Sequence, residues 1–321
     1  MQVIKSEDVK SDFSELKKKW EDILRKYYIN NKTLNPEYTI KVSCPHCNLK
    51  DIESSFDLNG FTHNICSNCK TLFVSPRLND ICIEELYSDE YYNEIYTRSM
   101  LPVFEKRKKL IGQRKFAQVI SFHDENMKGR VLDIGAGIGE VIDVFKDEGW
   151  VTHAIEMNPV AAEWLSGRGY NEVFLGSLDD YTTDKKFDII MAWGVIEHLV
   201  AADDFLNRVN NLLAPNGLLI SEVPHGQCLL VDFVRKTGTD PKRILMGEQH
   251  IVLYSKKAYI ELHQRNGFNQ VHIQTNGLDC DTIFKEKGIS VSDEILANLQ
   301  ECVDEKMYGD LLRGFWRKID S

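Results

Sequence analysis

A glycine-punctuated turn that follows an apolar segment is the first place where this chain could do chemistry. Residues 131–139 read Val-Leu-Asp-Ile-Gly-Ala-Gly-Ile-Gly, a D-x-G-x-G-x-G spacing, and Glu156 ends the next apolar run. A dinucleotide fingerprint, G-x-G-x-x-G, would need a glycine where Glu140 stands, and a carboxylate there would repel a pyrophosphate. Asp133 suits a positively charged ligand instead. The spacing therefore favours S-adenosylmethionine (SAM), whose ammonium and sulfonium groups carry positive charge.

This turn resembles motif I of the class I SAM-dependent methyltransferases, and the likeness extends over residues 129–275. In an open α/β sheet, a ligand lies beyond the carboxyl ends of the strands. Glycine lets backbone N–H groups approach that ligand closely, and Glu156 can accept hydrogen bonds from both ribose hydroxyls. Met157 offers an apolar plate for the adenine, and residues 177–178 could frame its edge. The predicted cofactor-binding residues are Asp133, Gly135, Ala136, Gly137, Glu156, Met157, Ser177, Leu178, Trp193 and Gly194.

Three histidines stand where a base for the methyl acceptor would be needed. Methyl transfer is an in-line displacement, and alignment alone can supply about 7–11 kcal/mol. A hydroxyl acceptor must also lose its proton, for which a histidine is the natural base. The candidate catalytic residues are His198 after the fourth predicted strand, His225 after the fifth, and His250. His198 is favoured by its position, and the adjacent Glu197 is expected to point elsewhere on a helix.

Four cysteines form the second strong pattern in the chain. Cys44 and Cys47 make one C-x2-C knuckle, and Cys66 and Cys69 make another after eighteen intervening residues. Two such knuckles complete a tetrahedral four-thiolate shell suited to Zn²⁺. Asn59-Gly60 between them is a hairpin turn dipeptide. The pattern predicts a zinc ribbon whose closed shell makes the metal structural rather than catalytic.

Other readings of the cysteines and their neighbours are weaker. A redox C-x-x-C would need only one pair, in a thioredoxin-like βαβ context that this segment lacks. His46 and His63 are the alternative zinc ligands. The remaining cysteines share no spacing and are expected to be buried thiols; they are Cys82, Cys228, Cys280 and Cys302.

Length, composition and net charge limit which classes of protein this chain can belong to. At 321 residues and 43% hydrophobic composition, the chain can bury an α/β core with room for a smaller second domain. The net charge of −10 disfavours nucleic acid and anionic membranes as main partners. Residues 1–8 carry no apolar signal-peptide region, and no apolar run has membrane-spanning length. The composition predicts a cytoplasmic protein whose cysteines are thiols or metal ligands.

The elements that would position these residues follow from hydrophobic periodicity, and they predict a Rossmann-like α/β sheet of mostly parallel strands. The expected strands are 130–134, 151–156, 172–175, 187–192, 217–223, 268–275 and a late antiparallel 311–317. The expected helices of this domain are 138–148, one beginning near Pro159, 203–213 and 256–266, with further helix in 279–308.

The N-terminal third is expected to be helical around the zinc ribbon. Residues 11–28 carry an apolar stripe that includes Phe13 and Trp20, typical of a helix that docks within the chain. Residues 31–36 look like a polar linker. A helix over 103–122 carries a basic cluster at 105–109, which is expected to be a solvated face.

The domain organisation predicted from these patterns has four parts. They are an N-terminal docking helix and linker (1–40), the zinc ribbon (41–78), a helical connector (79–128) and a class I methyltransferase domain (129–321) with insertions near 225–254 and 279–308.

Motifs outside the glycine turn narrow the resemblance. They are Phe73-Val74-Ser75-Pro76-Arg77, Leu86-Tyr87, Tyr91-Tyr92, Ile196-Glu197-His198-Leu199, and residues 249–255 followed by Asn266-Gly267-Phe268. With the ribbon, they resemble the zinc-ribbon class I methyltransferases common in bacterial surface-polysaccharide and sugar-modification pathways. This resemblance implies O-methylation of a sugar, nucleotide sugar or sugar derivative, with SAM as cofactor and S-adenosylhomocysteine as product.

Four alternatives stay open at this point. Sugar C-methyltransferases carry the same ribbon but a longer C-terminal domain than this chain has, and N-methylation of a small molecule fits the same motifs. An RNA methyltransferase is disfavoured by the acidic balance and by a ribbon whose basic residues are only Lys70 and Arg77. A non-catalytic SAM-binding protein would not need Asp133, Glu156 and His198 together. A homo-oligomer is neither required nor excluded.

Overall fold

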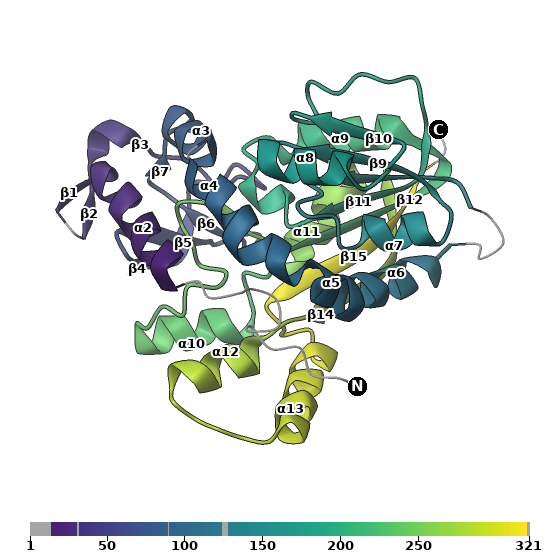
Figure 1. Ribbon diagram of the computed structural model, residues 1–321. Coiled ribbons are helices and arrows are strands. Elements are labelled where there is room, and N and C mark those ends of the chain that lie inside the picture. The colour runs from purple at the N-terminus through teal and green to yellow at the C-terminus, as the bar shows by residue number, and fades with distance from the viewer. Residues whose placement is uncertain (1–13, 31, 89, 124–127, 320–321) are drawn as a thin grey trace.

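The computed structural model describes residues 14–30, 32–88, 90–123 and 128–319, and its largest element is a seven-stranded sheet (Figure 1). The strand order is β10-β9-β8-β11-β12-β15-β14, and only β15 runs antiparallel to its neighbours. The strands are β8 (Arg130–Ile134), β9 (Val151–Glu156), β10 (Glu172–Leu175), β11 (Phe187–Trp193), β12 (Leu213–Pro224), β14 (Phe268–Asn276) and β15 (Leu311–Lys318). The predicted Rossmann-like sheet of mostly parallel strands is confirmed.

Both faces of this sheet are buried, which explains why its strands read as continuous apolar runs. Side chains alternate between two cores, because successive residues of a strand point to opposite faces. Val131 and Ile189 belong to one core, whereas Leu132 and Ile190 belong to the other. The covering helices are α6 (Gln113–Ile120), α7 (Ile142–Asp147), α8 (Pro159–Ser166), α9 (Ala202–Leu212) and α11 (Lys256–Arg265).

The helix after the glycine turn begins later than the sequence predicts. Residues 138–148 were expected to be helical, but α7 starts at Ile142. Gly137 and Gly139 have φ values of +58° and +79°, in the left-handed region that a continuous helix cannot contain. The turn is therefore longer than expected. Non-helical backbone follows the end of β8 before α7 begins at Ile142.

The zinc-ribbon segment forms a second sheet, of order β13-β6-β5-β4. Its strands are β4 (Ile52–Leu58), β5 (Phe61–Cys66), β6 (Leu72–Val74) and β13 (Val252–Leu253). The predicted Asn59-Gly60 hairpin turn is confirmed, with both residues at positive φ. β13 comes from the expected insertion at 225–254 and pairs antiparallel with β6. A segment from the C-terminal half of the chain thus supplies one strand of this second sheet.

The N-terminal helix α2 (Ser14–Leu24) docks within the chain, as expected. Leu16 and Trp20 are buried against Leu86 and Tyr91 in one hydrophobic cluster. Phe13, which was assigned to the same stripe, lies outside the described residues. The helix continues into a 3₁₀ turn, η1 (Arg25–Tyr27).

The predicted polar linker at 31–36 is wrong. This segment contains strand β2, which pairs with β1 and is followed by a 3₁₀ turn, η2. The Asn30 side chain accepts hydrogen bonds from the backbone N–H groups of Lys32 and Thr33 and so closes the hairpin. The bounds here are β1 (Tyr28–Asn30), β2 (Thr33–Leu34), η2 (Pro36–Tyr38), β3 (Thr39–Ile40) and β7 (Arg77–Leu78), of which β3 pairs with β7.

The connector is a chain of helical segments that runs from the ribbon to the sheet (Figure 1). It comprises α3 (Asp80–Ser88), α4 (Glu90–Glu94), a π-helix η3 (Ile95–Met100), η4 (Leu101–Val103), α5 (Phe104–Arg107), a second π-helix η5 (Lys108–Gly112) and α6. The helical prediction over 103–122 is confirmed apart from its π-helical part.

The basic cluster at 105–109 is not simply a solvated face. Lys108 Nζ lies 2.7 Å from the Asp143 carboxylate on α7, and Arg107 pairs with Glu140. Burial alone would raise the pKa of Asp143, but hydrogen bonds from Arg168 and Lys108 hold it well below its usual range. Asp143 on α7 and Glu140 in the preceding turn are therefore paired with Lys108 and Arg107. These ion pairs hold the connector against the glycine turn.

Three further helices lie below the zinc-ribbon segment in Figure 1, and one of them, α13, packs against strand β14 of the large sheet. These helices are α10 (Leu229–Thr237), α12 (Asp279–Glu286) and α13 (Asp293–Glu305), which confirms the helical prediction for 279–308.

Cys82, Cys228 and Cys280 are buried as expected, but Cys302 is exposed on α13. In the part of the chain that the structure describes, no helix has the length and apolarity needed to cross a membrane.

We expect the loss of Arg313 to destabilise the sheet strongly. Its guanidinium donates to Glu222 from Nε at 2.8 Å, and Lys115 Nζ lies 2.9 Å from the same carboxylate. All three side chains are largely buried, and Arg313→Met leaves Glu222 with Lys115 but removes the two hydrogen bonds that Arg313 donates; removing one partner of a buried ion pair typically costs about 3–5 kcal/mol. Urea unfolding measures this free energy.

Arg317→Met is the matched control, since Arg317 donates to backbone carbonyls of Asn216 and Phe122. The double variant Glu222→Gln/Arg313→Met should recover none of the lost stability, because it leaves the buried Lys115 ammonium without its carboxylate partner. Arg313 and Lys115 outweigh burial and lower the pKa of Glu222 to about 2. Its stabilising effect should therefore be lost as pH falls from about 4 towards 2 in the parent protein. A loss below about 1 kcal/mol in Arg313→Met would contradict the assignment.

Candidate active site

The glycine turn after β8 is held against the neighbouring strand by its own backbone. The N–H groups of Gly135 and Ala136 donate to the Ile155 carbonyl at 2.9 and 3.1 Å. Gly135 has φ of +68°, and a Cβ there would lie 2.9 Å from the Val195 side chain. Only glycine fits this position, because both the backbone angle and the space exclude a side chain.

Glu156 lies at the mouth of this turn, where sequence analysis placed it. Its carboxylate accepts hydrogen bonds from the N–H groups of Gly137 and Asn158, each at 2.7 Å. The side chain is buried, and burial raises its pKa despite these donors. Two backbone donors thus hold a carboxylate at the carboxyl end of β9, beside the glycine turn.

Asp133, at the end of β8, carries an unpartnered oxygen. Its side chain is buried, and Oδ1 has no hydrogen-bond partner among the described residues. Burial raises the pKa of Asp133 well above its usual range, and the nearby Glu140 adds to this shift. The free protein therefore leaves a polar atom here that a ligand could satisfy.

The connector covers the glycine turn with a tyrosine that sequence analysis did not assign to the site. The hydroxyl of Tyr96, on η3, lies 4.0 Å from the position that a Cβ on Gly137 would occupy. Burial raises the pKa of Tyr96, and Glu156 and Glu140 raise it further. Its place at the turn depends on how the connector packs, for which the sequence carries no local signal.

The other predicted cofactor-binding residues fall into different environments. Met157 is 67% exposed, whereas Leu178 is only 6% exposed and packs in the sheet core rather than framing an open edge. Ser177 Oγ donates to Asp180 at 2.6 Å. Trp193 lies beneath Lys115, whose Nζ is 3.9 Å from the centre of the indole ring. Gly194 follows with φ of +69°.

Two of the three candidate histidines meet beyond the end of β11. The ring centroids of His198 and His250 lie 4.9 Å apart, although the two residues are far apart in the sequence. His198 Nδ1 lies 3.0 Å from the Gln249 carbonyl and 2.7 Å from the Tyr87 hydroxyl. A carbonyl can only accept, so the Gln249 contact is a hydrogen bond in the tautomer with the proton on Nδ1 and the lone pair on Nε2, in which the Tyr87 hydroxyl oxygen also accepts rather than donates.

Glu197 completes this cluster, so the expectation that it points elsewhere is wrong. Residues Ile196–His198 form a 3₁₀ turn, η6, not an α-helix. Glu197 Oε1 lies 3.9 Å from His198 Nε2, and Oε2 is buried with no partner in the described part of the chain. Burial raises the pKa of Glu197 to about 8 and lowers the pKa of His198 to about 4.

His225 occupies a different place from the other two histidines. Its Nδ1 lies 3.1 Å from the Gly309 carbonyl, and its backbone N–H donates to the Asp310 carbonyl. The ring is buried, and burial lowers its pKa to about 4. These contacts tie His225 to the segment before β15, and none of those described joins it to His198.

Tyr87 is the neighbour of His198 that site prediction missed. It lies on α3, 111 residues before His198, and stacks on Tyr92 with ring centroids 5.3 Å apart. The Tyr92 hydroxyl is buried and lacks a partner among the residues described. The Leu86-Tyr87 and Tyr91-Tyr92 motifs were the available signal, because they belong to the sugar-methyltransferase resemblance.

The four predicted zinc ligands converge in one cluster. Their sulfur atoms all lie within 4.8 Å of one another, with Cys44–Cys69 and Cys47–Cys66 each at 3.5 Å. Zn–S bonds of about 2.3 Å in a tetrahedron would place thiolates about 3.8 Å apart, so this geometry fits the metal. The alternative ligands are engaged elsewhere: His46 Nε2 contacts Glu261, and His63 Nδ1 contacts the Phe61 carbonyl.

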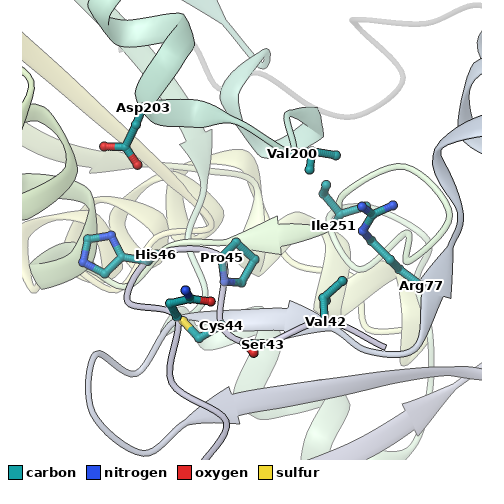
Figure 2. Close-up of a pocket in the computed structure, with 10 residues that line it drawn as sticks. Val42, Ser43, Cys44, Pro45, His46, Arg77, Val200, Asp203 and Ile251 are labelled. Carbon is teal, nitrogen blue, oxygen red and sulfur yellow. The ribbon is translucent and has the colours of Figure 1, made fainter. Parts of the chain in front are cut away.

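A cavity of about 550 Å³ separates the first cysteine knuckle from the loop after η6 (Figure 2). Its lining residues are Val42, Ser43, Cys44, Pro45, His46, Asn48, Arg77, Val200, Asp203 and Ile251. Arg77 is buried and engages Asp80 and the Leu78 carbonyl through Nη1. Val200 and Ile251 directly follow the two histidine segments, so the cavity borders the candidate site.

Comparison with known proteins identifies the family. A family model described as a methyltransferase domain matches residues 103–273, more than half of the chain. The chain belongs to this methyltransferase family. With the sheet order and glycine turn described above, it is a SAM-dependent methyltransferase. No curated protein matches it.

Two solved methyltransferase structures illustrate what this chain is similar to. A SAM-dependent methyltransferase from Archaeoglobus fulgidus is 20% identical, with a TM-score of 0.48, over 72% of this chain and 100% of that chain. The 1,6-didemethyltoxoflavin-N1-methyltransferase of Burkholderia thailandensis, solved with S-adenosylhomocysteine, is 17% identical, with a TM-score of 0.49, over 80% and 98%.

Proposed function

We propose that this methyltransferase transfers the methyl group of SAM to a hydroxyl of a sugar, nucleotide sugar or sugar derivative in surface-polysaccharide biosynthesis. The observation that carries the proposal is the arrangement of His198. Its Nδ1–H donates to the Gln249 carbonyl, which leaves a lone pair on Nε2 beyond the end of β11. An acceptor hydroxyl in line with the methyl group would lie at this end of the sheet.

In the proposed complex, SAM lies across the glycine turn. Glu156, already oriented by the N–H groups of Gly137 and Asn158, accepts hydrogen bonds from the ribose hydroxyls. The unpartnered oxygen of Asp133 faces the cationic methionine end of the ligand. A nearby ammonium group would also favour the charged form of this carboxylate.

The proposed reaction balances charge within the site. The acceptor oxygen forms a bond to the methyl carbon while the sulfur–methyl bond breaks, which converts SAM to S-adenosylhomocysteine. The hydroxyl proton moves to Nε2 of His198 and later to solvent. The positive charge of the sulfonium disappears as that of the imidazolium appears, so the net charge of the site is unchanged. Glu197, close to Nε2, adds a carboxyl that can receive a hydrogen bond from the imidazolium.

The composition of the acceptor region supports a small polar substrate. Tyrosine rings and buried polar groups from the connector face the cluster around His198. Aromatic faces and hydrogen-bonding groups together suit a polyhydroxylated ring. The net charge of −10 disfavours a nucleic-acid acceptor.

We also propose that Cys44, Cys47, Cys66 and Cys69 bind one structural Zn²⁺. Beyond the fit of the sulfur atoms, the ribbon is coupled to the site through strand pairing. Val74 N–H donates to the Ile251 carbonyl at 3.1 Å, and Val252 pairs with Phe73. Zinc would therefore stabilise the strand that fixes the segment carrying Gln249 and His250.

Replacing Glu156 with alanine should weaken SAM binding. Buried ribose hydroxyls without a partner cost on the order of 1–3 kcal/mol, so the affinity should fall about tenfold or more. Isothermal titration calorimetry with SAM measures the change. Glu163→Ala, an exposed carboxylate on α8, is the matched control and should bind like the parent protein. Unchanged affinity in Glu156→Ala would contradict the proposed ribose contact.

Protein purified without chelator should contain about one Zn²⁺ per chain, because metal binding at such a site contributes folding free energy. Cys66→Ser should lose the metal and lower the unfolding temperature before any chemical step is affected. Cys302→Ser, on the exposed face of α13, should change neither quantity. Elemental analysis and thermal unfolding are the measurements, and zinc-free parent protein would refute the ribbon site.

His198→Ala and His198→Gln should lower turnover by about 10²-fold or more while SAM affinity is retained. The assay follows SAM-dependent mass gain of one methyl group on nucleotide sugars and phosphorylated sugars. His225→Ala is the matched buried-histidine control, and His250→Ala tests the second member of the cluster. Turnover that survives in His198→Ala but collapses in His225→Ala or His250→Ala would reassign the base. Full activity in all three variants would mean that no histidine removes the proton.

A further inference from the structure

The cluster beyond β11 contains more possible metal-ligand atoms than the proposed proton transfer needs. Glu197, His198 and His250 each offer a ligand atom, and these atoms all lie within 4.8 Å of one another. Two imidazoles and one carboxylate are a common ligand set for divalent transition metals. Only one base is needed to deprotonate a hydroxyl, so the convergence of three groups points to an additional role.

Both histidines have the hydrogen bonding that metal ligands usually show. His198 Nδ1 lies 3.0 Å from the Gln249 carbonyl, and His250 Nδ1 lies 2.8 Å from the Ile244 carbonyl. Donation from Nδ1–H to a carbonyl fixes the tautomer in which the lone pair is on Nε2, and it orients the ring. The backbone of one short loop, residues 244–249, therefore presets both imidazoles.

Glu197 supplies the third donor from inside the protein. It is 3% exposed, its Oε1 lies 3.9 Å from His198 Nε2, and its Oε2 is buried with no hydrogen-bond partner in the described residues. An unsatisfied buried carboxyl oxygen is unfavourable, and a bound cation would satisfy it. This oxygen is a second observation, independent of the histidine geometry, that indicates a missing ligand.

We propose that Glu197, His198 and His250 bind a divalent transition-metal ion, of the Zn²⁺, Co²⁺ or Ni²⁺ class, and that the bound ion inhibits methyl transfer. Nitrogen ligands select these ions over Mg²⁺ and Ca²⁺, which prefer oxygen. The ion takes the Nε2 lone pair of His198 and so removes the base. The inhibitory part rests on the proposed function, whereas binding of the ion does not.

This site differs in kind from the cysteine cluster. Four thiolates form a closed shell, whereas three protein ligands leave coordination positions open for water or a small ligand. An exchangeable ion is therefore expected at Glu197, His198 and His250, and a tightly held one in the ribbon. Chelation by EDTA should empty the first site before the second.

Cobalt binding to the full-length protein tests the site directly. Protein that retains its ribbon zinc, as verified by elemental analysis after EDTA treatment, is titrated with Co²⁺ and followed by visible absorption. One equivalent should bind with weak ligand-field bands and without the intense near-ultraviolet band of cobalt–thiolate bonds. His250→Ala should weaken this binding at least tenfold. His272→Ala, an exposed histidine on β14, is the control and should bind like the parent.

Turnover tests the inhibitory part separately. In the parent protein, Co²⁺ or Zn²⁺ should lower the rate of methyl transfer, and EDTA should restore it. Whatever activity His250→Ala retains should resist the same ion concentrations. Absence of Co²⁺ binding would overturn the site even if the enzyme methylates sugars. Binding accompanied by faster turnover would overturn inhibition, and binding without turnover on any sugar acceptor would support the site while refuting the proposed function.

Discussion

The antiparallel pairing of β13 with β6 is the contact on which the candidate site depends most. It joins Val252–Leu253 of the methyltransferase domain to Leu72–Val74 of the ribbon by backbone hydrogen bonds. The loop just before β13 carries Gln249 and His250, so its position is set by a strand from a much earlier part of the chain. Ser255 Oγ reinforces this link by donating to the Cys69 carbonyl at 2.6 Å. The cysteine cluster, the strand pairing and the orientation of the histidines are therefore physically connected.

Buried carboxyls in this protein take different roles because their surroundings differ. Glu222 is surrounded by Arg313 and Lys115, and its pKa lies near 2 despite burial. Glu197 lies just beyond the end of β11. Among the described residues, no Lys or Arg side chain pairs with it, and burial raises its pKa to about 8. Asp133 keeps an oxygen unpartnered. Carboxylates paired with cations, such as Glu222 and Asp143, hold the sheet and connector together, whereas the buried carboxyl oxygens without a partner in the described residues belong to Asp133 and Glu197 at the candidate site.

Several elements were predictable because their signals are local. The bounds of β8, β9 and β10 follow from short apolar runs that end in polar or glycine residues. The Asn59-Gly60 hairpin follows from turn chemistry. Other expectations failed where tertiary contacts overruled local composition. Thr33–Leu34 form a hairpin strand followed by a 3₁₀ turn, and Lys108 and Arg107 pair with carboxylates on α7 and its turn. Composition cannot reveal a partner thirty-five residues away.

The sequence by itself determined the glycine turn, the acidic residue after it, the four-cysteine pattern and the order of strands and helices. Each of these is encoded within a few neighbouring residues or in a fixed spacing. Only the tertiary structure decided that Tyr87, His198 and His250 meet, that His225 does not join them, and that Glu197 turns towards the imidazoles. Those contacts join segments up to 111 residues apart, and they depend on how connector, ribbon and sheet pack, which no local pattern specifies.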